Sequence, residues 1–167
     1  LKRSTRTANL LALGLAVALA IPLIGLIYTV GEFREIMLHP QSVSGALRQN
    51  GASWSTFGLI IGTAAFKTAF TEELLFRGFI AKRLIASLGM KWGNMIQAVL
   101  FGILHSIFFL SITDKVWFLL VIFLIPTLGA LGKAFINERY ANGSIIPGWI
   151  THATANILSY STVVFVL

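Results

Sequence analysis

The chain has 167 residues, of which 56% are hydrophobic and 11% are charged, whereas about 25% of the residues of a soluble domain are charged. A soluble fold of this size could not bury so much apolar surface, so lipid must solvate part of it. The net charge of +7 comes from basic residues that lie mainly at the ends of apolar runs, which suits anionic lipid headgroups and not nucleic acid, and the absence of cysteine excludes disulfides and a cysteine nucleophile.

Five apolar segments follow one another along the chain, and each is close to the ~20 residues that an α-helix needs to cross a bilayer. Because the segments are continuously apolar and do not alternate, helices are favoured over the strands of a membrane barrel. We therefore expect an all-α fold, a polytopic transmembrane helical bundle of about five spans that forms a single domain over residues 1–167. The segments are 8–30, 54–80 with helical character continuing to residue 88, 93–112, 116–136 and 144–166.

The first segment begins like a signal peptide, because Lys2, Arg3 and Arg6 precede an apolar run in which residues 18–20 read Ala-Leu-Ala. The run continues to Val30, which is longer than the apolar part of a signal peptide. We therefore interpret this segment as a retained span.

The charged residues between the segments predict a topology. By the positive-inside rule the N-terminus is expected in the cytoplasm, and the charge-balanced residues 31–53 form a non-cytoplasmic loop. Asp114 and Lys115, whose charges cancel, fall on that outer side as well. The connections expected on the inner side contain Lys82, Arg83, Lys91, Lys133, Glu138 and Arg139. The chain is thus expected to be a multi-pass integral membrane protein.

The second segment contains three charges within six residues, namely Glu72, Glu73 and Arg77. Insertion scales give roughly 2.5–3.5 kcal/mol per charge at mid-membrane, so something must justify them. Glu73 and Arg77 share a helix face and can pair, whereas Glu72 lies about 100° further round and suits general-base chemistry. The simpler alternative is a span that ends earlier and leaves these charges at the interface. Lys67 lies about 140° from Glu72 and is a poor partner for it, so its role stays open.

Two later segments add further polar groups. His105 lies in the third segment, and His152 and Asn156 lie four residues apart on one helix face in the fifth. The last two can donate hydrogen bonds and could form an oxyanion hole. The simpler interpretations are an interior hydrogen-bonded histidine and polar contacts between helices. Taken together, however, three spans supply a carboxylate base, an imidazole and an amide donor, without any G-x-S-x-G elbow or H-E-x-x-H zinc pair.

The motifs E-E-x-x-x-R from residue 72, F-x-x-x-H from residue 101 and H-x-x-x-N from residue 152 resemble, in this order, the signature of the CPBP family. That family comprises the CAAX proteases and bacteriocin-processing enzymes and is also called the Abi family. The resemblance covers residues 56–158, which we interpret as a CPBP-like core that contains the polar site. It implies an intramembrane protease whose eukaryotic relatives cut the last three residues from prenylated proteins.

The resemblance also implies roles for individual residues. Glu72 would activate the attacking water with the help of His105, while His152 and Asn156 would stabilise the oxyanion. No cofactor is implied, although two glutamates and two histidines would also suit a divalent metal ion. The resemblance further implies that Glu73 and Arg77 pair with each other and support the site structurally.

Three functions follow from these observations. The favoured one is a glutamate-dependent intramembrane endopeptidase that acts on a peptide or membrane-protein substrate in the bilayer. The alternative is a catalytically silent homologue that serves as a membrane scaffold, immunity protein or complex-assembly protein, with the small residues of its spans packing against a membrane-protein partner. A transporter or channel is a third interpretation, since intramembrane Glu, Lys and His often mark ion paths, but no inverted repeat is visible in the sequence.

Overall fold

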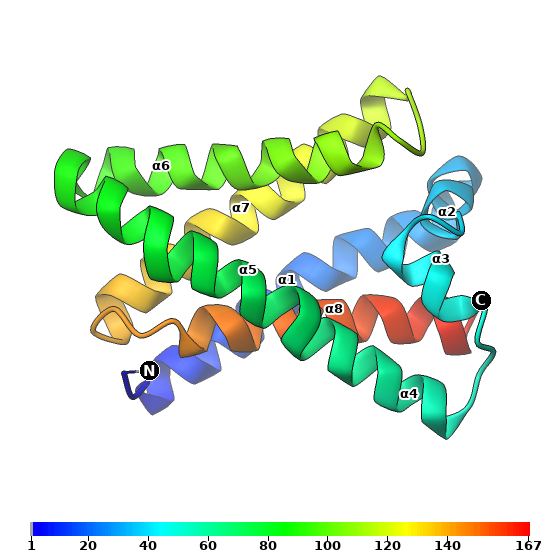
Figure 1. The fold of residues 1–167 in the computed structure, drawn as a ribbon, viewed down its shortest axis with the longest axis horizontal. Helices are drawn as coiled ribbons and strands as arrows, with labels where there is room; N and C mark the ends of the chain where they lie inside the picture. Colours follow the sequence, from blue (N-terminus) through cyan, green and yellow to red (C-terminus); the bar gives the residue numbers. More distant parts are fainter. Residues whose placement is uncertain (1) are drawn as a thin grey trace.

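Helices form all the regular structure of residues 2–167, which the computed structural model describes. The predicted all-α fold is therefore confirmed. The long helices pack side by side as a bundle, and two short helices, α2 and α3, cover one end of it (Figure 1). In chain order the elements are α1 (Arg6–Thr29), α2 (Gly31–Met37), α3 (Val43–Arg48), α4 (Trp54–Ile61), the π-helix η1 (Gly62–Phe70), α5 (Thr71–Glu73), the π-helix η2 (Leu74–Ile80), α6 (Ala81–Phe109), α7 (Val116–Tyr140) and α8 (Ile146–Phe165).

A sharp reversal at Gly89 divides the helical run from Trp54 to Phe109. Gly89 has φ 77° and ψ 167°, a backbone conformation that is essentially restricted to glycine. After the reversal, Gly93 lies so close to the backbone of Ile85 that a Cβ atom would not fit. The remainder of α6 then runs back beside α7 (Figure 1). The second and third apolar segments are the two arms of this run.

The arm before the reversal is widened by two π-helices, η1 and η2, which flank the three residues of α5. In a π-helix each hydrogen bond reaches back five residues, and such turns occur frequently at functional sites. Two threonine hydroxyls follow the same spacing, because Thr68 donates to the Thr63 carbonyl at 3.0 Å and Thr71 donates to the Phe66 carbonyl at 3.2 Å. Widened turns therefore surround the paired glutamates of α5.

Small residues bring α1 close to the helices that carry the polar groups. Every fourth residue of α1 is a buried alanine at positions 8, 12, 16 and 20, and the Thr151 hydroxyl of α8 donates to the Ala12 carbonyl at 3.0 Å. On α7, Gly129 and Gly132 lie against Leu19 and Leu15 of α1. Small residues in membrane helices allow this kind of close approach. Both of these glycines thus pack within the chain itself.

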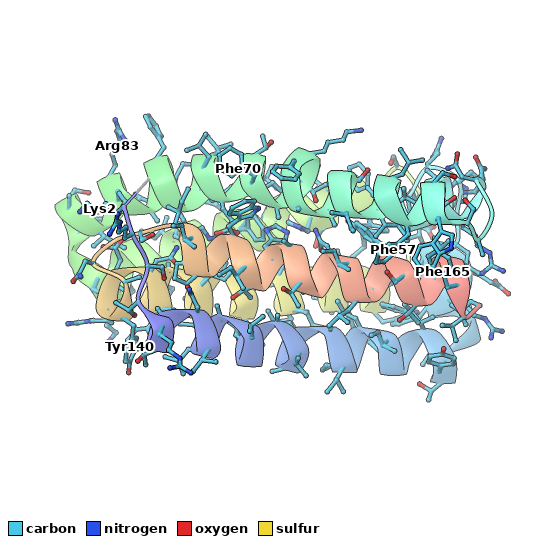
Figure 2. The ribbon with its side chains drawn as sticks, turned by 90° about the horizontal axis from the view of Figure 1, so that it is seen from below. Lys2, Phe57, Phe70, Arg83, Tyr140 and Phe165 are labelled. Atoms are coloured by element: carbon cyan, nitrogen blue, oxygen red, sulfur yellow. The ribbon has the colours of Figure 1, made fainter. Side chains whose placement is uncertain are left out.

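The two ends of the bundle collect different connections. At one end the N-terminal segment docks on the α7–α8 loop, where the Ser144 hydroxyl donates to the Lys2 carbonyl at 2.7 Å. Lys82 pairs with Glu138 at 3.0 Å at the same end. At the other end Glu32 of α2 pairs with Lys115 at 3.1 Å. Figure 2 shows the separation, with Lys2, Arg83 and Tyr140 at one end and Phe57 and Phe165 at the other.

Long apolar helices and an apolar outer surface confirm the membrane assignment. Three helices are long and apolar enough to cross a membrane: α1, the run Trp54–Phe109, and α7. Large apolar side chains point away from the bundle, among them Ile21 at 63% exposure and Leu128 at 59%. Lipid would cover such side chains. The number of spans, about five, stays a prediction, and so does the side of the membrane that each end faces.

Candidate active site

Glu73 is the centre of a buried cluster of charges. Its side chain is fully buried, and its Oε1 atom lies 3.0 Å from Nη1 of Arg77 and 2.7 Å from Nζ of Lys133. The Arg77 contact is an ion pair by distance without a hydrogen-bonding angle, so Arg77 acts through its charge. The ion pair expected from the four-residue spacing is therefore present. Two buried cations surround one buried anion, which leaves one positive charge to be balanced.

Phe101 of α6 covers the two cations with its ring. The Arg77 guanidinium lies 4.2 Å from the ring centroid and the Lys133 ammonium lies 4.7 Å from it. A cation over an aromatic face is attracted by the ring quadrupole, more strongly where water is absent. Phe101 thereby fixes α6 against the charge cluster.

The start of α8 is built to approach this cluster. Pro147 lies in the first turn, where its missing N–H is not needed. Gly148 follows, and a Cβ atom there would lie 2.7 Å from Oε2 of Glu73. One helical turn later, Nδ1 of His152 lies 3.0 Å from Oε1 of Glu73. The Pro-Gly sequence thus lets α8 bring His152 directly to the buried carboxylate.

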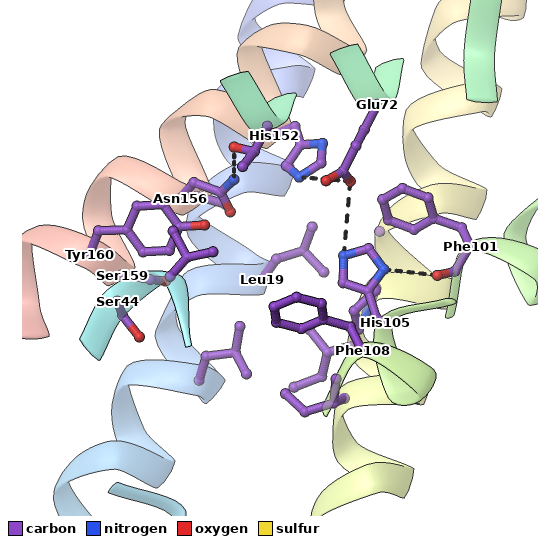
Figure 3. Close-up of a pocket in the computed structure, with 18 of the residues that line it drawn as sticks. Leu19, Ser44, Glu72, Phe101, His105, Phe108, His152, Asn156, Ser159 and Tyr160 are labelled. Carbon is purple, nitrogen blue, oxygen red and sulfur yellow. Dashed lines mark hydrogen bonds and ion pairs between the residues drawn. The ribbon is translucent and has the colours of Figure 1, made fainter. Parts of the chain in front are cut away.

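Glu72 is placed differently from its neighbour. Its Oε2 atom is buried and has no hydrogen-bond partner among residues 2–167. That atom lies 3.8 Å from Nε2 of His152 and 4.0 Å from Nε2 of His105 (Figure 3). Both distances exceed a direct hydrogen bond. One free carboxylate oxygen therefore faces two imidazole nitrogens that come from two other helices.

His105 has a defined tautomer. Its Nδ1 atom lies 2.8 Å from the Phe101 carbonyl oxygen, which can only accept a hydrogen bond. The proton of the neutral ring is therefore on Nδ1, and Nε2 carries a lone pair. Since Nε2 faces Glu72, two hydrogen-bond acceptors converge on the same small space.

Asn156 lies one helical turn beyond His152 on α8. Its Nδ2 atom donates to the Thr68 hydroxyl at 3.1 Å. An amide nitrogen has two N–H groups, so a second donor remains. The hydrogen bond of Asn156 is thus made to Thr68 of η1 and leaves Glu72 to the histidines.

A cavity of ≈ 500 Å³ joins these groups. Glu72, His105, His152 and Asn156 all line it, so α5, α6 and α8 bring the four predicted catalytic residues to one space. Figure 3 shows Glu72 between the two histidines, with Asn156 and Tyr160 further along α8. Most of the remaining lining is apolar, and includes Leu19, Leu23, Ile27, Phe76, Phe108 and Ile122.

Comparison with models of protein families matches residues 52–158 to the type II CAAX prenyl endopeptidase Rce1-like family. The chain belongs to this family. The match confirms the resemblance to the CPBP family, of which Rce1-like proteins are part. No curated protein and no solved structure matches the chain.

Membership of the Rce1-like family makes this a membrane protein of a protease family, whose substrates are peptides or proteins in a membrane. All three motifs fall inside the matched residues. Within residues 2–167, no group of three or more His, Cys, Asp or Glu side chains is arranged to hold a metal ion.

The environment predicted for Lys133 from the sequence is wrong. By the positive-inside rule the sequence predicts Lys133 among the charges on the inner side of the membrane, together with Glu138 and Arg139. The helix continues to Tyr140, and Lys133 lies inside the bundle at 3% exposure. The apolar residues on both sides of Lys133 were the available signal. Lys67, by contrast, is exposed on η1 and is not among the residues that line the cavity.

Proposed function

We propose that this Rce1-like protein is a glutamate-dependent intramembrane endopeptidase. The observation that supports it best is the free Oε2 atom of Glu72, which faces the Nε2 atoms of His105 and His152 across 4.0 and 3.8 Å. Separations of this size are bridged by one water molecule and not by a direct bond. Glu72 is then the general base, and His105 helps to position the water by accepting a hydrogen bond from it.

The chemistry follows from the two acceptors. A water that donates one hydrogen to Glu72 and the other to the lone pair of His105 Nε2 keeps its oxygen lone pairs free for attack. As the water oxygen bonds to the peptide carbonyl carbon, Glu72 takes the proton and the carbonyl oxygen becomes an oxyanion. When the C–N bond breaks, Glu72 returns that proton to the leaving amine. The immediate products are an amine and a carboxylic acid, which keeps the second hydrogen of the water and ionises when it loses that proton to solvent.

His152 and Asn156 are the proposed oxyanion donors. Asn156 retains one N–H beside its bond to Thr68. Donors held in place in a water-poor site stabilise a developing charge more than water does. The apolar part of the cavity, lined by Leu23 and Phe108 among others, would hold an apolar portion of the substrate such as a prenyl chain.

The buried charges of the cluster favour an ionised base. Arg77 and Lys133 exceed Glu73 by one positive charge, and an anionic Glu72 restores neutrality. An isolated carboxylate in an apolar pocket would instead take up a proton. The cluster is thus proposed to keep Glu72 ready to accept a proton from water.

The test compares Glu72→Gln with the wild-type protein, purified in micelles and given a prenylated peptide that ends in a CAAX sequence. We expect a loss of about 10²–10⁴-fold in cleavage rate, the usual contribution of a general base. Glu35→Gln is the matched control, because Glu35 is an exposed glutamate of α2, outside the cavity, and should leave the rate unchanged. A Glu72→Gln protein that cleaves at the full rate would refute the proposal.

A further inference from the structure

Lys133 contacts both Glu73 and His152, the two buried groups beside the cavity. Its Nζ atom lies 2.7 Å from Oε1 of Glu73 and 3.3 Å from Nδ1 of His152. Nδ1 of His152 also lies 3.0 Å from Oε1 of Glu73. Three polar atoms therefore meet, and one proton on the imidazole decides how they bond.

Two arrangements fit these distances. In the first, Nδ1 carries the proton of the neutral ring and donates it to Glu73, which leaves a lone pair on Nε2. In the second, Lys133 donates to a lone pair on Nδ1, and the proton is on Nε2. The first makes His152 an acceptor toward the cavity, whereas the second makes it a donor.

The surroundings of Oε1 favour the second arrangement. Lys133 donates a hydrogen bond to Oε1 at 2.7 Å, and the Arg77 guanidinium balances the charge of the same atom from 3.0 Å without a hydrogen bond. The polarised N–H of a neutral ring with its proton on Nδ1 would point its positive end toward Oε1, where two cations already lie, and would face the Lys133 ammonium at 3.3 Å. A lone pair on Nδ1 instead receives one of the three ammonium protons.

We infer that Lys133 sets the tautomer of His152, with the lone pair on Nδ1 and the proton on Nε2. The inference rests on the proposed function for its chemical meaning. Nε2 of His152 is the atom that faces Glu72, so a neutral His152 becomes the hydrogen-bond donor that an oxyanion requires. His105 holds the opposite tautomer, with its lone pair toward the same carboxylate. Lys133 is thus a positioning residue: it makes Nε2 of His152 a hydrogen-bond donor, while Nε2 of His105 is an acceptor.

The deciding measurement is nitrogen-15 NMR of the whole protein with labelled histidine, in micelles and without substrate. The chain has three histidines, and spectra of His39→Gln and His105→Gln assign the signals. Chemical shifts separate protonated from unprotonated ring nitrogens, and couplings to the ring carbon-bound protons distinguish Nδ1 from Nε2. We expect a neutral His152 with its proton on Nε2 in the wild-type protein. A proton on Nδ1, or on both nitrogens, would overturn the inference without any variant.

Lys133→Met removes the donor while keeping an unbranched side chain. In this variant we expect the His152 proton to move to Nδ1, where it donates to Glu73. A Lys133→Met protein that keeps the proton on Nε2 would also overturn the inference. Lys82→Met is the matched control, because Lys82 pairs with Glu138 away from the cavity, and it should leave the His152 signals unchanged.

Cleavage assays add a second readout. In Lys133→Met the oxyanion donor is lost, so we expect kcat to fall by about 10²–10³-fold. KM should change little, because the donor acts mainly in the transition state. The tautomer is measured without substrate. A protein that has the expected tautomers but cleaves no CAAX peptide would therefore refute the proposed function and leave this inference standing.

Discussion

Lys133 on α7 lies 2.7 Å from the carboxylate of Glu73 on α5, although the two residues are 60 positions apart in the sequence. Both side chains are buried, and Arg77 contacts the same carboxylate oxygen. Each charge of a buried ion pair has a large desolvation cost, which only its partner offsets. The three charges therefore stabilise the bundle only as a complete set.

Replacing Glu73 with Gln should be strongly destabilising, because it leaves Arg77 and Lys133 buried without the anion that contacts them both. We expect a loss of about 3–5 kcal/mol in the free energy of unfolding, the usual result when one partner of a buried pair is removed. Unfolding in mixed micelles by a denaturing detergent measures it. Glu138→Gln, which breaks the partly exposed pair with Lys82, should cost at most about 1 kcal/mol. Equal losses for the two variants would contradict this account.

The sequence predicted those features that depend on local pattern. Continuous apolar runs gave the helices, and the four-residue spacing gave the Glu73–Arg77 ion pair. Local spacing also separated Glu72 from that pair, and the structure leaves its Oε2 without a hydrogen bond. The catalytic roles of Glu72 and the cavity residues on α6 and α8 stay predictions, although these residues line one cavity.

Features that depend on contacts between distant segments were not accessible in this way. Lys133 looks like an end-of-helix cation unless it is known that α5 and α8 pack against it. The π-helices of the second segment have no clear signal in its residues, because apolar residues suit both α and π turns. Gly89 was an ordinary glycine in the sequence, and its backbone angles are determined by the reversal between two packed arms.

Gly102 is expected to be intolerant of a side chain. It lies where α6 crosses α7, and a Cβ atom would lie 2.6 Å from the Phe123 carbonyl oxygen and would overlap the Thr127 hydroxyl. Overpacking of this kind costs about 1–3 kcal/mol, so Gly102→Ala should lower the free energy of unfolding by that amount. Gly14→Ala is the control, since no atom in the part of the chain that the structure describes lies within 4 Å of its Cβ position. A Gly102→Ala protein as stable as Gly14→Ala would show that the helices do not approach so closely.

Gly89 is expected to be required for its backbone and not for space. Its Cβ position has no atom of the described residues within 4 Å, but φ is 77°. Gly89→Ala should therefore cost about 1–3 kcal/mol through strain alone. Gly58→Ala lies on the same helical run in open helical geometry and should be neutral or stabilising by up to about 1 kcal/mol. The comparison is again made by unfolding in mixed micelles, and a neutral Gly89→Ala would argue for a continuous helix there.

The topology can be tested without a background signal, because the chain contains no cysteine. Ser111 follows α6, and Ser55 lies in the first turn of α4, at the end of the bundle where Glu32 meets Lys115. Ser87 precedes the reversal near the opposite end. Each can be replaced by cysteine, one at a time, with little change in size. Residues 31–53 and the N-terminus are predicted to lie on opposite sides of the membrane.

In intact cells, a membrane-impermeant maleimide should label Ser55→Cys and Ser111→Cys directly and Ser87→Cys only after the membrane is opened. Ser4→Cys, beside the N-terminus, should behave like Ser87→Cys, because the N-terminal segment docks at that end through the bond from Ser144 to the Lys2 carbonyl. Labelling of all four from outside would contradict the spanning bundle. Labelling of only Ser4→Cys and Ser87→Cys from outside would keep the bundle but reverse its orientation, and would show that the excess of Lys and Arg at one end does not decide the topology of this chain.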